Sequence, residues 1–192
     1  MHSLRTFLFV FTCVALASCT ESARKADSYF DSLVTNQVKV LSLAKASILK
    51  QARIDGNQDE TTFTPDSTLW ENELDIFRQL EIYERPAYRD AYEIKDGISD
   101  GKSNLTVRSY HALKSIPVRD LKFYYHDQFQ HLKKIEATYQ EQNTLYTTWR
   151  TLQMDFEEVN GKSVLSSYGI RGIQKMILSD SIKFSIHSKV IF

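Results

Sequence analysis

The strongest constraint on the fold is a change of hydrophobic period near Pro86. Beyond this residue, apolar and polar side chains alternate, as they do in strands that bury one face. The clearest case is the C-terminal segment, where Ile182, Phe184 and Ile186 are separated by polar residues. The segment from about residue 88 to residue 192 is therefore predicted to form β-strands.

Turn residues divide this segment into strands. Asn160-Gly161 is the typical dipeptide of a tight hairpin and joins predicted strands near 145–157 and 163–178. Further divisions are expected at 100–104, between strands near 89–97 and 105–114, at Pro117, and at 127–130. Short connections of this kind indicate an antiparallel meander of six or seven strands.

Two helices are predicted before the strands. The first covers about 28–54, a stretch without Gly or Pro in which Phe30, Val34 and Ile48 lie near one stripe. The second covers about 66–82 and follows Thr64-Pro65, which is typical of a helix start. The predicted class is α+β: one domain over 28–192, with two N-terminal helices packed on one face of the sheet.

Composition limits the classes of partner. The 192 residues carry 24 basic and 24 acidic side chains and show no basic stripe. A near-neutral chain has no electrostatic means of holding a polyanion, so nucleic-acid binding is not expected.

The first residues have the pattern of an export signal. Arg5 precedes the apolar run Thr6–Leu16, which is too short to span a bilayer as a helix. The run ends in Leu16-Ala17-Ser18-Cys19, which resembles the lipobox of bacterial lipoprotein precursors. An ordinary secretory signal and a transmembrane anchor are the alternatives.

The lipobox resemblance implies a processing route and an address. The chain would be cleaved between Ser18 and Cys19, and lipid on the Cys19 thiol would fix it to a membrane of the cell envelope. Thr20 stands where an Asp commonly retains such proteins in the inner membrane, which implies delivery to the outer membrane. Residues 20–27 would form a short polar tether. The other cysteine, Cys13, lies in the removed segment, so no intramolecular disulfide is expected.

No catalytic, metal or cofactor site is predicted. The segment 97–103 has glycine spacing close to that of a phosphate-binding loop, but it has the wrong length and precedes a strand. His126, Asp127 and His131 flank an expected turn and lack further ligands for a metal. The Ser166-Ser167 pair lies in a strand pattern, which is unusual for a nucleophile.

Three aromatic residues define a candidate binding face. Tyr110, Tyr124 and Trp149 each lie opposite the most apolar side of their predicted strands. Such amphipathic rings suit a contact surface on the sheet face that the helices leave open. The alternative is that they are scattered exposed aromatics.

Three functions follow as hypotheses. The first is a non-enzymatic, lipid-anchored module that binds an envelope protein or glycan through its sheet. The second is a carrier or sensor of a lipophilic ligand in a curved-sheet groove, and the third is a hydrolase. Segments 70–77 and 172–177 also resemble small bacterial envelope lipoproteins of unknown function, which transfers no site residues.

Overall fold

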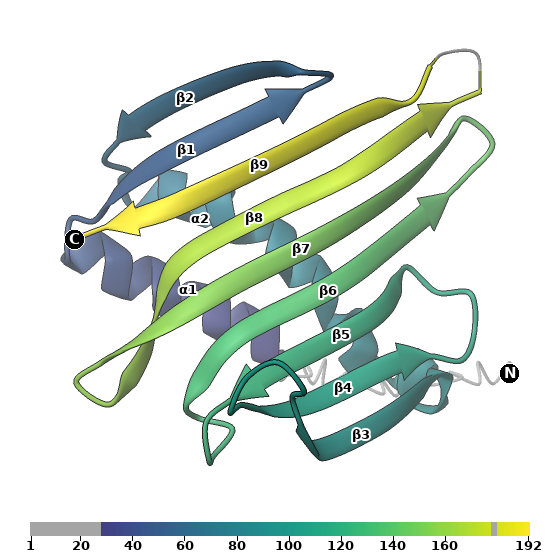
Figure 1. The fold of residues 1–192 in the computed structure, drawn as a ribbon, viewed down its shortest axis with the longest axis horizontal. Coiled ribbons are helices and arrows are strands. Elements are labelled where there is room, and N and C mark those ends of the chain that lie inside the picture. Colours follow the sequence, from purple (N-terminus) through teal and green to yellow (C-terminus); the bar gives the residue numbers. More distant parts are fainter. Residues whose placement is uncertain (1–27, 178–179) are drawn as a thin grey trace, which may run out of the picture.

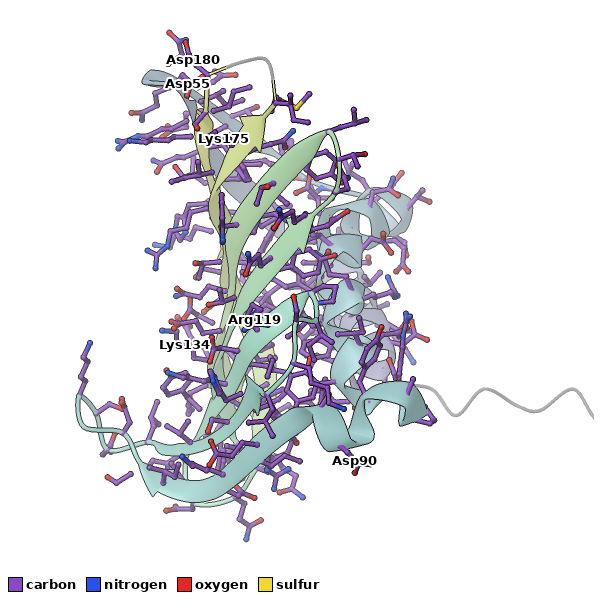
Figure 2. All side chains as sticks on the ribbon, turned by 90° about the vertical axis from the view of Figure 1, so that its right-hand side faces the viewer. Asp55, Asp90, Arg119, Lys134, Lys175 and Asp180 are labelled. Carbon is purple, nitrogen blue, oxygen red and sulfur yellow. The ribbon has the colours of Figure 1, made fainter. Side chains whose placement is uncertain are left out.

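The computed structural model describes residues 28–177 and 180–192, which form two layers. One layer is a single antiparallel sheet, and the other consists of helices that lie on one side of it (Figure 1, Figure 2). The α+β class is therefore confirmed. The predicted signal segment, the cleavage point and Cys19 lie outside the described residues.

The elements follow one another in this order: α1 (Tyr29–Leu43), β1 (Ser47–Ile54), β2 (Asn57–Phe63), α2 (Ser67–Leu74), the 3-10 helices η1 (Asp75–Glu84) and η2 (Pro86–Ala91), β3 (Tyr92–Ser99), β4 (Thr106–Ala112), β5 (Val118–Tyr125), β6 (Leu132–Gln142), β7 (Tyr146–Val159), β8 (Lys162–Met176) and β9 (Ile182–Ile191). The described sheet has nine strands in the order β2-β1-β9-β8-β7-β6-β5-β4-β3. From β3 to β9 it is a meander, and the early hairpin β1–β2 is added beside the last strand through the pairing of β1 with β9.

The prediction of one helix over 28–54 was wrong in its second half. Helix α1 ends at Leu43, and Lys45 has a positive φ of 51°. The chain then returns as β1, whose Ile48 lies opposite Val190 in β9. The stripe from Phe30 to Ile48 thus belongs to two elements that bury apolar residues in the same core.

The same error explains the strand count. Asp55 and Gly56 both have positive φ, at 48° and 90°, and connect Ile54 to its partner Asn57. This is a two-residue hairpin turn, which favours Asp-Gly. Because β1 and β2 come between the helices, the sheet has nine strands instead of six or seven, and the helices are not both N-terminal to it.

The second predicted helix, over 66–82, is present in two forms. Asp66 caps α2 by accepting a hydrogen bond from the Leu69 amide at 2.8 Å, and the α-helix ends at Leu74. The chain continues as 3-10 helix through Glu84. Pro86 then begins η2, and strand β3 starts at Tyr92.

The later turns agree with the sequence pattern. Val159 pairs with Lys162 across the Asn160-Gly161 turn, whose residues have φ of 51° and 73°. The 100–104 turn joins β3 to β4, and the 127–130 turn joins β5 to β6. The segment 97–103 is the end of β3 and this turn, as expected from its spacing.

The core lies between the helices and the sheet. Helix α1 contributes a buried stripe that includes Phe30, Val34 and Leu41. Phe123 of β5 is fully buried there, with its ring centroid 5.5 Å from that of Tyr29 and 5.9 Å from that of Phe30. Other fully buried members come from the second helix and from β5 to β7: Trp70, Leu74, Phe77, Leu80, Leu121 and Met154. Burial also raises the pKa of Tyr29 to about 12.

Candidate binding trough on the open sheet face

The sheet face opposite the helices faces the viewer in Figure 1, and no helix within 28–177 or 180–192 covers it. Its central strands β7, β8 and β9 align three rows of outward side chains. The rows are Gln153–Gly169–His187, Thr151–Arg171–Ser185 and Trp149–Ile173–Lys183. Because residues two apart on a strand are separated by about 6.5 Å, the rows span about 13 Å along the strands.

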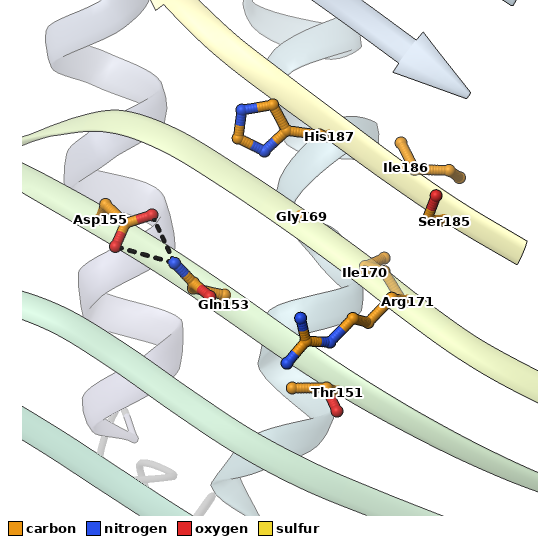
Figure 3. A pocket seen from close by; sticks show the side chains of 9 residues that line it. All are labelled: Thr151, Gln153, Asp155, Gly169, Ile170, Arg171, Ser185, Ile186 and His187. Atoms are coloured by element: carbon orange, nitrogen blue, oxygen red, sulfur yellow. Dashed lines mark hydrogen bonds between the residues drawn. The ribbon is translucent and has the colours of Figure 1, made fainter. Parts of the chain in front are cut away.

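The first two rows surround a hollow of about 200 Å³ (Figure 3). Gly169 lies between Gln153 and His187 and contributes no side chain. A Cβ at this position would lie 2.9 Å from the Ile186 carbonyl oxygen and 3.6 Å from Nδ1 of His187. The hollow therefore exists because position 169 is glycine, and it is bordered by polar groups of three strands.

Asp155 provides a fixed acceptor at one end of this hollow. Its carboxylate accepts two hydrogen bonds from Nε2 of Gln153, at 3.0 and 2.9 Å, and one from the Ser167 hydroxyl at 2.8 Å. Figure 3 shows the Gln153 contacts and places His187 across β8 from Asp155. The carboxylate is held by its neighbours and keeps unused acceptor capacity.

A second hollow of about 340 Å³ adjoins the first along the strands. Its outward side chains include Trp149, which is 44% exposed, and Ile173, which is 39% exposed. These two residues are cross-strand neighbours. The hollows share Thr151 and Arg171, so together they form one shallow depression that we call the trough.

The trough carries more positive than negative charge. Arg150 borders it but directs its guanidinium to Glu141, 3.8 Å away. Arg171 and Lys183 also line it, against the carboxylate of Asp155. Within 28–177 and 180–192, neither cation makes a side-chain ion pair. Cation, carboxylate, amide and hydroxyl groups thus lie on the same surface as the exposed ring of Trp149.

The polar groups do not form a nucleophilic triad. Ser167, His187 and Asp155 have the residue types of one, but the Ser167 hydroxyl donates to Asp155. Within the described part of the chain, no hydrogen bond joins His187 to either partner. Nucleophilic catalysis needs the base to contact the nucleophile, so this arrangement suits binding better than acyl transfer.

One predicted face residue was wrongly placed. Tyr110 lies opposite Leu121 and faces the helices, where its ring centroid is 4.6 Å from that of Tyr83. Val107 lies on the outward side of β4, in the same cross-strand row as Ile98 and Tyr124, and is nevertheless only 8% exposed. The more aliphatic side of β4 was therefore not the side that packs against the helices.

Tyr124 and Trp149 do lie on the open face, but they do not share a site. Tyr124 is aligned with Lys134 and Asp155, and Nζ of Lys134 lies 5.1 Å from its ring centroid. Trp149 is six residues away from Asp155 along β7, which corresponds to about 20 Å. Only Trp149 borders the trough.

The histidines noted in the sequence form local contacts. His126 Nδ1 lies 2.9 Å from Asp127, and the His126 amide donates to the His131 carbonyl. His111 Nδ1 lies 2.7 Å from Asp120 at the surface. The described residues include no group of three or more potential ligands that could hold a metal ion.

The trough was missed from the sequence because its centre lacks a side chain. Gly169 and Gly172 both fall inside the β8 pattern, and a glycine within a strand often marks a close approach of other atoms. At Gly172, a Cβ would lie 2.9 Å from the Phe184 ring. These two glycines were the available signal.

Comparisons with protein-family models, curated proteins and solved structures find no match to this chain. In the part of the chain that the structure describes, no helix has the length and apolar character needed to cross a membrane.

Proposed function

We propose that this protein is a lipid-anchored lipoprotein of the cell envelope, most simply at the outer membrane, that acts as a non-enzymatic binding module. The anchor proposal is supported by Leu16-Ala17-Ser18-Cys19. The binding proposal is supported by one observation above all. The open sheet face carries a trough floored by Gly169 and bordered by the held carboxylate of Asp155 at one end and the exposed Trp149 at the other. Between them lies Arg171, which makes no side-chain ion pair with the residues that the structure describes.

The attachment point is compatible with an accessible open face. Ser28 precedes α1 in the helix layer and donates to Glu81 of η1 at 3.0 Å. An extended tether from Cys19 to Ser28 reaches at most about 30 Å. The chain would therefore leave the domain from its helix layer, and the opposite face is free to turn away from the lipid.

The core packing favours this proposal over a carrier of lipophilic molecules. A carrier would need ligand space between the sheet and the helices. There, Phe30, Trp70 and Phe77 are fully buried, and side chains of β5 to β7 pack between them. Interiors of this kind are close-packed. A hollow of about 200 Å³ does lie between α2 and the sheet, but it is lined by the hydrogen-bonded polar groups of Glu73 and Tyr168, which do not suit a lipophilic ligand.

The anchor is tested by metabolic labelling. Radiolabelled palmitate is expected to enter the product of the full gene and to be absent when Cys19 is replaced by Ala. The wild-type protein should fractionate with envelope membranes. An unprocessed, unlabelled wild-type chain would contradict the anchor.

The binding face is tested by site-specific photo-crosslinking in intact cells. A photo-reactive residue at Lys183, beside the trough, is expected to give discrete adducts with envelope material. The matched control is Asn36, which is exposed on α1 in the helix layer. Adducts from Asn36 alone, or from neither position, would contradict a binding role for the open face.

A further inference from the structure

We propose that the trough binds a glycan strand whose sugars carry carboxylate groups. This inference rests on the proposed binding function and names its ligand class. The trough-lining groups are Trp149, Thr151, Gln153, Asp155, Arg171 and His187, with Lys183 at one end.

The trough presents hydrogen-bond donors and acceptors side by side. Arg171 and Gln153 can donate, and Asp155 can only accept when ionised. A ligand that satisfies such a set must itself offer both donors and acceptors, closely spaced along its length. Sugar hydroxyls do both, because each has one O–H donor and two lone pairs.

The trough also presents an exposed aromatic ring. Trp149 is 44% exposed and lies beside Ile173, with polar rows on the side toward His187. A sugar ring has an apolar face of C–H groups and a polar rim, which matches an exposed indole bordered by hydrogen-bonding groups. The three rows extend about 13 Å, which suits a short run of sugar rings instead of a single small molecule.

The charge of the trough favours a ligand with isolated carboxylates. Arg171 and Lys183 exceed the one carboxylate by a single charge, so the trough attracts isolated carboxylates moderately. A phosphate-rich surface would place dense negative charge against Asp155, whose orientation is fixed by Gln153 and Ser167. The same carboxylate disfavours an anionic lipid bilayer as the occupant.

The position of the trough in the sheet excludes a peptide that binds as an added strand. The trough lies on the central strands β7, β8 and β9, each of which pairs on both sides. Their backbone groups are used within the sheet, so an extended peptide cannot join them as a further strand. Recognition at the trough must depend on side chains.

The two tryptophans supply a direct readout. Trp70 is fully buried, whereas Trp149 is exposed in the trough, so an aqueous quencher such as acrylamide acts mainly on Trp149. The experiment uses the full-length lipoprotein purified in detergent. The probe is peptidoglycan glycan strands freed of peptides by an amidase, because their lactyl groups supply carboxylates.

Saturating glycan strands are expected to reduce the quenching constant at least about twofold. Arg171→Ala should weaken the apparent affinity about tenfold, which is the effect of losing one charge-assisted hydrogen bond. Lys122→Ala removes a cation from the same face outside the trough and should change nothing. Trp149→Ala should abolish the heat of binding in calorimetry, and Trp149→Phe should retain part of it.

Three results would overturn the inference: no protection of Trp149 by the strands, equal effects of Arg171→Ala and Lys122→Ala, or protection by anionic lipid vesicles instead. The glycan assignment fails and the binding function stands if the strands do not protect Trp149 while the photo-reactive residue at position 183 still gives adducts in cells. If the photo-reactive residue at position 183 gives no adducts either, the binding function itself fails.

Discussion

The two faces of the sheet are built from different chemistry on the same strands. On β7, Leu152, Met154 and Phe156 face the helices and are at most 4% exposed. The alternate residues, such as Gln153 and Asp155, face outward and bond to one another. The covered face therefore provides folding free energy, and the open face is available for substitution without loss of the fold.

The largest expected effect compares one aromatic residue from each face. Phe123→Ala should lower the free energy of unfolding by about 3–5 kcal/mol, since it leaves a cavity among Tyr29, Phe30 and Phe129. Trp149→Ala should change it by less than about 0.5 kcal/mol, because the ring is at the surface. Urea denaturation of both variants measures the difference. Similar losses would show that the open face also supports the core.

The next comparison concerns two glycines. Gly172→Ala should cost about 1–3 kcal/mol, because the new Cβ would meet the Trp149 carbonyl oxygen and the Phe184 ring. Gly101→Ala, in the β3–β4 turn, has no heavy atom within 4 Å of its new Cβ and should be close to neutral. Thermal unfolding distinguishes them. A neutral Gly172→Ala would mean that β8 can shift at this point.

A third comparison sets an ion pair on the covered side of the sheet against one on the open face. Glu73 of α2 lies 2.8 Å from Nζ of Lys50 and accepts from the Tyr168 hydroxyl at 2.8 Å, so Glu73→Ala should cost about 1–2 kcal/mol. Burial of the Tyr168 side chain raises the pKa of its phenol, so the hydroxyl keeps its proton and donates to Glu73.

On the open face, Glu136→Ala removes the contact with Lys134 and should cost less than about 0.5 kcal/mol. Chemical denaturation at low and high salt checks both variants. Equal losses would remove the distinction between the faces.

The smallest effect is a pH dependence on β3. Hydrogen bonds from Arg108 and Tyr125 lower the pKa of Asp96. A lowered pKa in the folded state adds stability above the unfolded value of about 3.9, and this contribution disappears as pH falls through the folded pKa. Asp96→Asn should therefore be slightly less stable at neutral pH, with the difference from wild type shrinking below about pH 4. A constant difference across that range would contradict the assignment.

The sequence predicted most of the meander because its turns depend on local chemistry. Asn160-Gly161 needs positive φ at two positions, which can be recognised without tertiary information. The strand 47–54 was harder to predict. Ile48 and Lys50 both face the helices, and the lysine is accommodated there only by Glu73 of α2.

The site was less predictable than the fold. Trp149 was identified from strand parity, but Tyr110 was assigned to the wrong face, because β4 buries an aliphatic residue on its outward side as well. Arg171 and His187 have no local pattern that marks them. They come together with Gln153 only through the pairing of three strands around Gly169.

The pairing of β1 with β9 has a consequence for how the chain is made. Residues near position 50 must wait for partners near position 188, so this part of the sheet closes only after the strands of the meander have been made. Until then β1 lacks its inner neighbour, which leaves a strand edge open to aggregation. A chain that lacks residues 183–192 should accumulate as insoluble material.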